Sequence, residues 1–213
     1  MSPDKNIDTA GQAIRLLRIQ GLQSSHGGPF SLEVAAGECV AILGASGSGK
    51  SVLLRMVADL DPHSGDAYLE HEARAAMPAP EWRRRVVYQA AEPAWWEPTA
   101  AAHFAEAKGT LMQGMLKQLG LDAELLDSDV TRLSTGQRQR LALLRSLMCK
   151  PRVLLLDEPT AALDQAAIQA VETLLQARLA EGLAIIWVTH SEEQARRVSS
   201  RRFEIRDRSL HPL

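Results

Sequence analysis

The sequence has little cysteine, few aromatic residues and almost no net charge. Its 213 residues include two cysteines, an aromatic fraction of 4% and a formal net charge of −2. Cys39 and Cys149 are too few for a disulfide framework and both lie in apolar stretches, so we expect reduced core thiols in a cytosolic protein. The nearly neutral charge gives no indication of binding to nucleic acid or to an anionic membrane surface.

Long apolar runs are also missing. The longest, residues 153–156 and 183–188, have the length of strands, whereas a helix that crosses a bilayer needs about 20 apolar residues. The first residues are polar and no apolar segment follows them, so we expect no signal peptide and a disordered segment over 1–12. Any role at a membrane would therefore require a partner.

What the chain does contain is a glycine-rich phosphate-binding segment. Residues 44–51 read Gly-Ala-Ser-Gly-Ser-Gly-Lys-Ser, which is the G-x-x-x-x-G-K-[ST] pattern of a P-loop. An apolar strand-like run precedes the segment and an apolar-periodic helix follows it, as phosphate binding requires. In such a loop the lysine neutralises the β- and γ-phosphates and the serine ligates magnesium. The expected nucleotide-binding residues are Gly44, Ala45, Ser46, Gly47, Ser48, Gly49, Lys50 and Ser51.

The order of elements predicts an α/β architecture. Short strands and turns over 14–43 favour antiparallel N-terminal strands, the helix after the P-loop should run to about Leu60, and residues 81–87 should lead into a strand ending near Tyr88. Residues 93–133 are rich in alanine, leucine and methionine at helical spacing, which indicates a small inserted helical subdomain over about 92–150. Buried strands at 153–156 and 183–188 favour a mainly parallel core sheet, within one domain that covers 13–213.

Two adjacent carboxylates follow the first of these buried strands. In a P-loop protein, Asp157 would hold the magnesium water shell and Glu158 would orient or deprotonate the attacking water. Two acids at a strand end could also begin an exposed turn, but a P-loop site needs a second carboxylate for its metal. The sequence therefore favours the catalytic interpretation for this pair.

Residues 133–137, Leu-Ser-Thr-Gly-Gln, open the helix before that strand. Taken alone, Ser134 and Gln137 form the S-x-x-Q pattern of a helix capping box. The succession of P-loop, Leu-Ser-Thr-Gly-Gln, Leu-Leu-Leu-Asp-Glu-Pro, Ala-Leu-Asp and Thr-His, however, resembles the ATP-binding cassette (ABC) ATPases from about residue 14 to 205. The resemblance implies a P-loop NTPase of ABC type in which His190 is the switch histidine, Asp164 belongs to the D-loop, and the signature consists of Leu133, Ser134, Thr135, Gly136 and Gln137.

The resemblance also implies a mechanism and its partners. In this family the signature reaches the ATP of the opposite subunit, so two copies would form a homodimer around two ATPs with Mg2+ and drive an integral membrane permease. The protein would then lie in the cytoplasm, on the inner face of the cell membrane. The helical lobe and the strand motifs look most like iron-exporter ATPases. Two alternatives are a soluble ABC-type ATPase acting on nucleic acid, ribosomes or iron–sulfur assembly, and a nucleotide-binding regulator without hydrolysis.

The chain departs from the family at the glutamine that ends the strand entering the helical lobe. Alignment of Glu92 and Pro93 with the family pattern puts Ala91 at the glutamine position, and Gln89 lies two residues earlier. Three interpretations stay open: Gln89 acts as the metal contact after a shift, Glu92 substitutes for it, or magnesium is sensed without it.

Two further departures concern the ends of the nucleotide. The aromatic residue that stacks on adenine upstream of the P-loop is missing, and His26 is the nearest residue that could replace it. Thr135 replaces the first glycine of the signature pair, while Gly136 remains. The lobe opens with Trp95-Trp96, for which two interpretations stay open, a place in the core and an exposed docking surface for the membrane partner. Adjacent side chains point to alternate sides, which favours docking.

Overall fold

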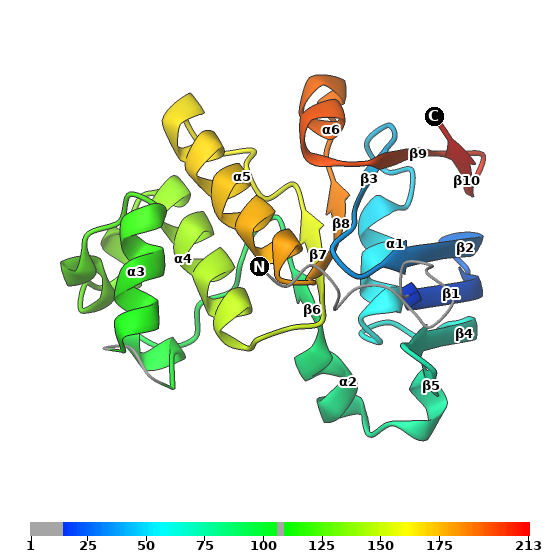
Figure 1. The fold of residues 1–213 in the computed structure, drawn as a ribbon, viewed down its shortest axis with the longest axis horizontal. Helices are drawn as coiled ribbons and strands as arrows, with labels where there is room; N and C mark the ends of the chain where they lie inside the picture. The colour runs from blue at the N-terminus through cyan, green and yellow to red at the C-terminus, as the bar shows by residue number, and fades with distance from the viewer. Residues whose placement is uncertain (1–14, 106–108) are drawn as a thin grey trace.

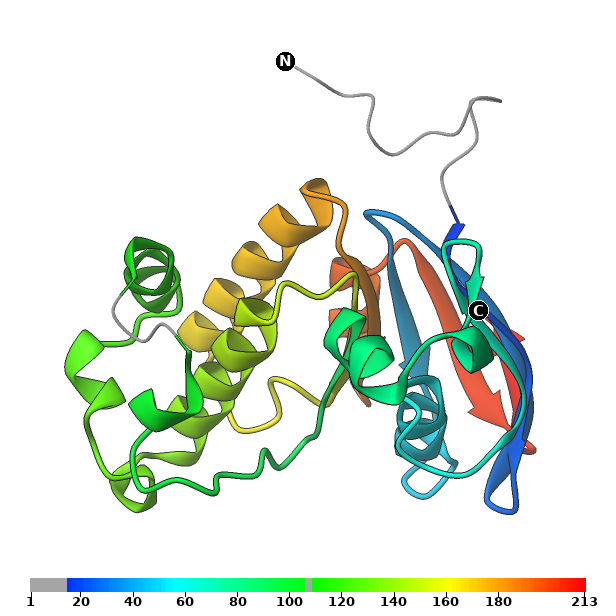
Figure 2. The ribbon, with the colours of Figure 1, turned by 90° about the horizontal axis from the view of Figure 1, so that it is seen from below.

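A computed structural model describes residues 15–105 and 109–213 (Figure 1). The expected disorder of residues 1–12 falls outside these described residues. Figure 1 shows a group of helices at one end of the molecule and an antiparallel sheet at the other. Figure 2 shows the central sheet between them.

The central sheet is parallel except at one edge. Its strand order is β10-β9-β3-β8-β7-β6, and β10 pairs antiparallel with β9 while the other neighbours pair parallel. Every residue of β3, β7 and β8 is buried, because helices or the second sheet cover both faces. The strands are β3 (Cys39–Leu43), β6 (Val86–Gln89), β7 (Val153–Asp157), β8 (Ala184–Val188), β9 (Arg201–Arg206) and β10 (Ser209–Pro212).

The second sheet is antiparallel and has the order β2-β1-β4-β5. Its strands are β1 (Arg15–Ser24), β2 (Gly27–Ala35), β4 (Ser64–Leu69) and β5 (Glu72–Ala73). Helix α1 (Lys50–Val57) packs between the two sheets, and side chains such as Phe30, Leu53 and Ile186 form one apolar cluster with it. The P-loop helix is therefore fixed from both sides.

A second apolar cluster lies on the opposite face of the central sheet. It joins Met115, Leu144, Leu174 and Trp187 from the helices and from β8. The helices there are α3 (Thr110–Gln118), α4 (Thr135–Met148) and α5 (Gln165–Ala180). Helix α2 (Ala79–Arg85) contacts β6, and helix α6 (Glu192–Val198) packs on β3. The remaining turns of helix are of the 3-10 type, at Arg74–Ala76, Ala101–His103, Ala123–Leu126 and Val130–Arg132. Within the described residues of the predicted helical subdomain, about 92–150, the α-helices are α3 and α4.

Helix α1 ends at Val57, whereas its predicted end was near Leu60. Strand β6 ends at Gln89, close to the predicted end near Tyr88, and helix α2 leads into it. Strand β10 was not predicted. Cys39 is buried as expected, and burial raises the pKa of its thiol to about 12. Cys149 is exposed, because it caps the C-terminus of α4 at the surface instead of packing in the core.

No helix within residues 15–105 and 109–213 combines the length and the apolarity that crossing a membrane requires.

Candidate active site

The P-loop connects the C-terminal end of β3 to the start of α1. Gly49 is the residue that caps the helix, and its φ of 103° is in the left-handed region that favours glycine. In the described chain no side chain caps this helix, so its first backbone N–H groups remain available to an anion. The Lys50 ammonium donates hydrogen bonds to the carbonyl oxygens of Gly44 and Ala45, at 2.8 and 2.9 Å.

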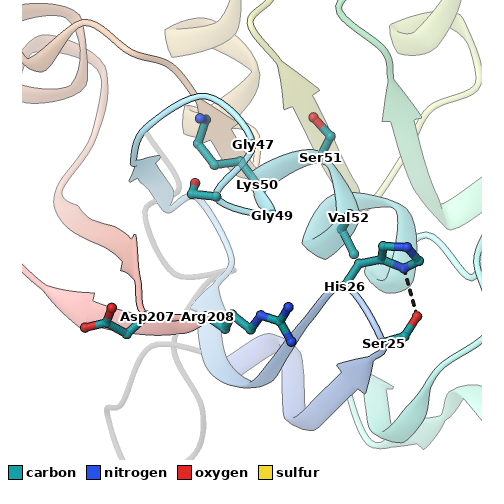
Figure 3. A pocket seen from close by; sticks show the side chains of 10 residues that line it. Ser25, His26, Gly47, Gly49, Lys50, Ser51, Val52, Asp207 and Arg208 are labelled. Atoms are coloured by element: carbon teal, nitrogen blue, oxygen red, sulfur yellow. Dashed lines mark hydrogen bonds between the residues drawn. The ribbon is translucent and has the colours of Figure 1, made fainter.

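A cavity of about 590 Å3 opens beside this loop, a volume within the usual range for small-molecule sites. Figure 3 shows Arg208 extending across this cavity from the turn between β9 and β10, toward the segment that carries His26. Sequence reasoning had considered His26 but not Arg208. The cavity is lined by Ser25, His26, Gly47, Ser48, Gly49, Lys50, Ser51, Val52, Asp207 and Arg208.

The paired acids lie at the end of β7, at the same edge of the sheet. Asp157 is 5% exposed, and the hydroxyl of Tyr88 on β6 donates a hydrogen bond to its Oδ2 at 3.0 Å. Burial, and after it the negative charge of Asp157, raises the pKa of the Tyr88 phenol above its ordinary value. Tyr88 therefore stays a protonated donor that fixes the carboxylate. The sequence contained a signal for it, since β6 was expected to end near this residue.

Glu158 is held in an uncommon backbone conformation beside His190. Its φ is 46°, its N–H donates to the carbonyl of Val188 at 3.1 Å, and its own carbonyl accepts from the Gln139 amide at 3.0 Å. The His190 Nδ1 lies 3.0 Å from the Glu158 Oε2. The structure thus brings together the two residues that the sequence predicted as catalytic.

A buried polar network lies beneath this pair. The Gln194 amide nitrogen donates to Thr160 and to Glu172, and its oxygen accepts from Thr189. Arg197 donates two further bonds to the Glu172 carboxylate, at 2.7 and 2.8 Å. Burial raises the pKa of Glu172, but these hydrogen bonds outweigh that effect and hold it below its ordinary value. Sequence reasoning missed the network, because its members come from four separate segments.

Gln89 is the last residue of β6 and pairs in register with Leu156, next to Asp157. It is 3% exposed, and neither its amide oxygen nor its nitrogen has a partner among the described residues. Ala91 lies beyond the end of the strand, and Glu92 is exposed. Of the three open interpretations, the geometry therefore favours Gln89, because only this residue ends a strand beside the acids.

The signature segment forms the start of α4. Ser134 caps the helix: its hydroxyl accepts from the Gln137 N–H at 3.2 Å, and the Gln137 side chain accepts from the Ser134 N–H at 2.9 Å. Gly136 lies against the carbonyl of Ala162 and the side chain of Leu163, in the segment before α5. None of the signature residues is among those that line the cavity beside the P-loop.

Asp164 caps helix α5 in the same way, because its carboxylate accepts a hydrogen bond from the Ala167 N–H at 2.8 Å. Leu133 is buried, whereas Ser134 and Thr135 are exposed. The predicted signature and D-loop residues are therefore neighbours on one surface, apart from the cavity.

A glycine loop between a parallel strand and a helix, with paired carboxylates at the end of another strand of the sheet, defines a P-loop NTPase. The chain belongs to the ABC transporter family, whose sequence profile, described as "ABC transporter", matches residues 28–161. The chain is an ATPase domain of that family.

Curated relatives of different kinds are similar to this chain. The macrolide export ATP-binding/permease protein MacB of Brucella abortus (strain 2308) is 37% identical over 198 residues, which cover 84% of this chain and 30% of MacB. The probable iron export ATP-binding protein FetA of Escherichia coli (strain K12) is 33% identical, with 78% and 77% covered. The lipoprotein-releasing system ATP-binding protein LolD of Nitratidesulfovibrio vulgaris (strain Hildenborough) is 33% identical, with 92% and 94% covered. The chain thus spans under a third of MacB but most of FetA and LolD.

Solved structures show the same fold. The ATP-binding subunit of an ABC transporter superposes with a TM-score of 0.83 at 23% identity, over 92% of this chain and 88% of that one. An ATP-binding cassette, solved as a dimer in a post-hydrolysis state with ADP and phosphate, gives a TM-score of 0.79 at 22% identity, over 92% and 97%. These likenesses confirm the predicted fold class.

Proposed function

We propose that the chain is the ATP-binding and ATP-hydrolysing subunit of an ABC transporter, and that two copies close around two ATPs to drive a separate membrane subunit. The observation that carries this proposal is the convergence of the P-loop, Asp157 and the hydrogen-bonded Glu158–His190 pair at one edge of the central sheet. Ligands bind at this edge in open α/β sheets, because the loops that follow the strands leave a crevice there.

Each residue has a distinct role in the proposed reaction. The N–H groups at the start of α1 hold the phosphates, and Lys50 exchanges its two carbonyl partners for phosphate oxygens. Glu158 accepts a proton from the attacking water, and His190 keeps the Glu158 carboxylate oriented toward that water. Hydrolysis of the terminal phosphate then needs no covalent intermediate with the protein.

The residues around Asp157 fit a magnesium ion. Mg2+ prefers oxygen ligands and takes one or two from protein, with phosphate oxygens and water for the rest. Ser51 and Asp157 offer a hydroxyl and a carboxylate. The orphaned, buried amide of Gln89 ends the strand beside β7, in register with Leu156, the residue before Asp157. The described residues contain no group of three or more His, Cys, Asp or Glu side chains able to hold a metal. When bound with ATP, the ion would neutralise charge on the phosphates.

The dimer follows from the position of the signature. A P-loop cavity that is not lined by Leu133–Gln137 leaves these residues to contact a nucleotide held by another copy. Ser134 and Gly136 occupy a helix N-terminus, whose partial positive charge favours an anion. ATP would therefore join two subunits, and hydrolysis would release them, which couples the chemistry to a movement of the partner.

The test of hydrolysis is the change Glu158→Gln. We expect ATP turnover to fall by roughly 100- to 10,000-fold, the usual contribution of a general base, while the affinity for ATP is retained. Glu192→Gln, an exposed carboxylate of α6 that pairs with Arg196, is the matched control and should hydrolyse ATP at the wild-type rate. Unchanged turnover in Glu158→Gln would contradict the proposal and favour a nucleotide-binding regulator.

We propose that Trp95 and Trp96 form the docking surface for the membrane subunit. Trp96 is 68% exposed, and the Arg145 guanidinium lies over both indole rings, 4.7 and 4.9 Å from their centres. His103 accepts hydrogen bonds from the backbone N–H groups of Trp96 and Glu97, both at 3.1 Å. A pre-ordered aromatic pair beside an arginine has the composition of protein-binding hot spots.

Replacement of both tryptophans by alanine should weaken recruitment to membranes that contain the partner and leave ATP affinity unchanged. Leu111→Ala removes another exposed apolar side chain, on α3, and serves as the control for a general loss of apolar surface. Equal membrane recruitment of the double variant and of wild type would rule out this docking surface.

The proposed cargo is iron, which the likeness to FetA supports, because FetA is named a probable iron export ATP-binding protein. Other relatives are named for macrolides and lipoproteins. Cells without the chain should accumulate more iron than complemented cells, and unchanged iron content would contradict this assignment. We place the subunit at the cytoplasmic face of the membrane through its permease. If the protein instead co-purifies with tightly bound nucleic acid and with no membrane protein, the result would favour the alternative of a soluble ABC-type ATPase.

A further inference from the structure

The turn between β9 and β10 places an arginine in the nucleotide cavity. Strands β9 and β10 are joined by Asp207 and Arg208, with φ angles of 50° and 61°. A two-residue turn of this kind favours glycine or asparagine, because other side chains are strained at positive φ. The chain has instead an arginine whose side chain lines the cavity.

This turn is fixed against the hairpin that contains His26. The N–H of Gly28, at the start of β2, donates a hydrogen bond to the carbonyl of Arg208 at 3.2 Å. The Ser25 hydroxyl lies 2.9 Å from the His26 Nδ1 in the same hairpin. The two turns together form the wall of the cavity beside the P-loop, as Figure 3 shows. The positions of Arg208 and His26 are thus set by backbone that does not belong to the P-loop.

Phosphates and base make different demands on such a cavity. The P-loop amides and Lys50 bind the triphosphate. The nucleoside then lies against the wall formed by the two turns. This wall contains no Phe, Tyr or Trp among the described lining residues, so the planar groups available for stacking are the Arg208 guanidinium and the His26 imidazole. A guanidinium stacks on an aromatic face through both its plane and its charge.

We infer that Arg208 binds the nucleoside end of ATP by stacking on the purine, in place of an aromatic side chain. The inference rests on the proposed ATP-binding function and adds a residue from the last hairpin of the structure to the site. Because stacking tolerates every base that has a π-face, this contact provides affinity rather than selectivity for adenine.

The experiment compares ATP with inorganic tripolyphosphate, which lacks the nucleoside. Binding of ATP to the full chain is measured by titration calorimetry in EDTA, so that no hydrolysis occurs, and tripolyphosphate is measured as a competitor. We expect Arg208→Ala to weaken ATP binding by roughly 5- to 30-fold and to leave tripolyphosphate binding unchanged. Arg208→Lys keeps the charge but loses the planar group, so it should bind ATP as weakly as Arg208→Ala.

The controls separate this inference from the proposed function. Arg206→Ala removes an exposed arginine of the same hairpin that is not among the cavity-lining residues, and should bind both ligands as wild type does. Lys50→Ala should weaken the binding of both ATP and tripolyphosphate.

Full affinity for ATP in Arg208→Ala or in Arg208→Lys, or equal losses for ATP and tripolyphosphate, would overturn the stacking role while the ATP site stands. A wild-type chain that binds no ATP would contradict the proposed function and the inference with it.

Discussion

Two helices in this structure begin with glycine-containing segments that the sequence assigned to phosphate binding, and their N-termini are built in opposite ways. Helix α1 begins after Gly49 and has no side-chain cap in the described chain. Helix α4 begins with a complete capping box formed by Ser134 and Gln137. The first helix therefore offers its N–H groups to a ligand, whereas the second already satisfies part of its own.

The supports of the two ends differ as well. The loops that carry Glu158 and His190 rest on the buried network of Gln194 and Glu172, whereas the start of α4 is held by hydrogen bonds at the surface. A site that binds its nucleotide alone needs open donors and a rigid base. A surface that contacts a nucleotide held by another subunit must be stable in the free subunit as well, before that contact forms. The contrast between an open and a capped helix start thus matches the two proposed roles.

The strongest way to break this comparison is to put a negative charge on the signature. Gly136→Asp should lower ATP turnover on the order of 100-fold, because a carboxylate near the partner's phosphates adds a repulsion of a few kcal/mol. An acidic residue in the first turn favours the helix itself. A Cβ at this position would lie 3.2 Å from the Ala162 carbonyl oxygen and from the Leu163 side chain, so any side chain here requires a small local shift. Gly136→Asn has the same size without the charge, and should turn over at least about 10-fold faster than the Asp variant if charge is the cause.

In both variants, ATP binding to the isolated subunit should match that of wild type. Weak ATP binding by a monomeric Gly136→Asp chain would mean that the signature contacts the ATP of its own subunit. The N-termini of α1 and α4 would then have the same role.

Removal of the P-loop lysine tests the other side of the comparison, the phosphate-binding start of α1. Lys50→Ala should weaken ATP binding in EDTA by roughly 10- to 100-fold, the value of one or two charge-assisted hydrogen bonds. Calorimetry measures the affinity, and Lys150→Ala, a change of an exposed lysine after α4, is the control. Retained affinity in the Lys50 variant would show that the open helix start suffices by itself.

The buried support can be tested through stability and its dependence on pH. Glu172→Gln should lower the free energy of unfolding by about 2 kcal/mol, because it removes charge-assisted hydrogen bonds from a buried group. The folded-state pKa of Glu172 is lower than its ordinary value of 4.5. Its contribution is therefore present above that pH and is lost as the pH falls through the folded pKa.

Melting curves at pH 7 and at pH 3 measure this effect: the gap in Tm between wild type and variant should narrow in acid. Glu181→Gln, a change of an exposed carboxylate that pairs with Arg178, should differ little from wild type at either pH. A gap that is constant with pH would contradict a charged Glu172 in the native state.

The surface cap should have the smallest effect. Ser134→Ala is expected to lower stability by about 1 kcal/mol, which corresponds to a fall in Tm of roughly 2–4 °C for a domain of this size. Thermal unfolding of the free subunit measures it, with Ser128→Ala as a control that removes a serine hydroxyl bound to a carbonyl of the short 3-10 helix Ala123–Leu126. A fall in stability as large as that of Glu172→Gln would indicate that the start of α4 is supported as rigidly as the loops above the Glu172 network.

Sequence reasoning succeeded where the signal is local. The P-loop, the acids after β7 and the capping box each occupy a few consecutive residues, and the structure places them as expected on a loop, a strand end and a helix start. The fold class was also predictable, since buried apolar runs that alternate with helices require a covered parallel sheet. Exposure of Cys149 was not, because a residue at the end of an apolar helix face can point either way.

Contacts between distant segments could not be predicted. Tyr88 reaches Asp157 only because β6 and β7 are neighbours in the sheet, and the sequence does not state which strands pair. Arg208 lines the cavity because the turn that carries it is held against β2, where the Gly28 N–H donates a hydrogen bond to the Arg208 carbonyl. This bond joins segments that are far apart in the sequence. For Gln89, alignment of neighbouring residues favoured Ala91, whereas the strand register favours Gln89 itself.

The position of β3 in the sheet has a consequence for the order in which the protein is made. This strand leads directly into the P-loop, yet both of its neighbours, β8 and β9, come from the far end of the sequence. During synthesis the phosphate-binding residues leave the ribosome long before the strands that hold them in place, and closing such long loops is slow. A growing chain without β8 and β9 therefore contains the complete P-loop sequence but no P-loop site, and ATP can stabilise the fold only after both strands have been made.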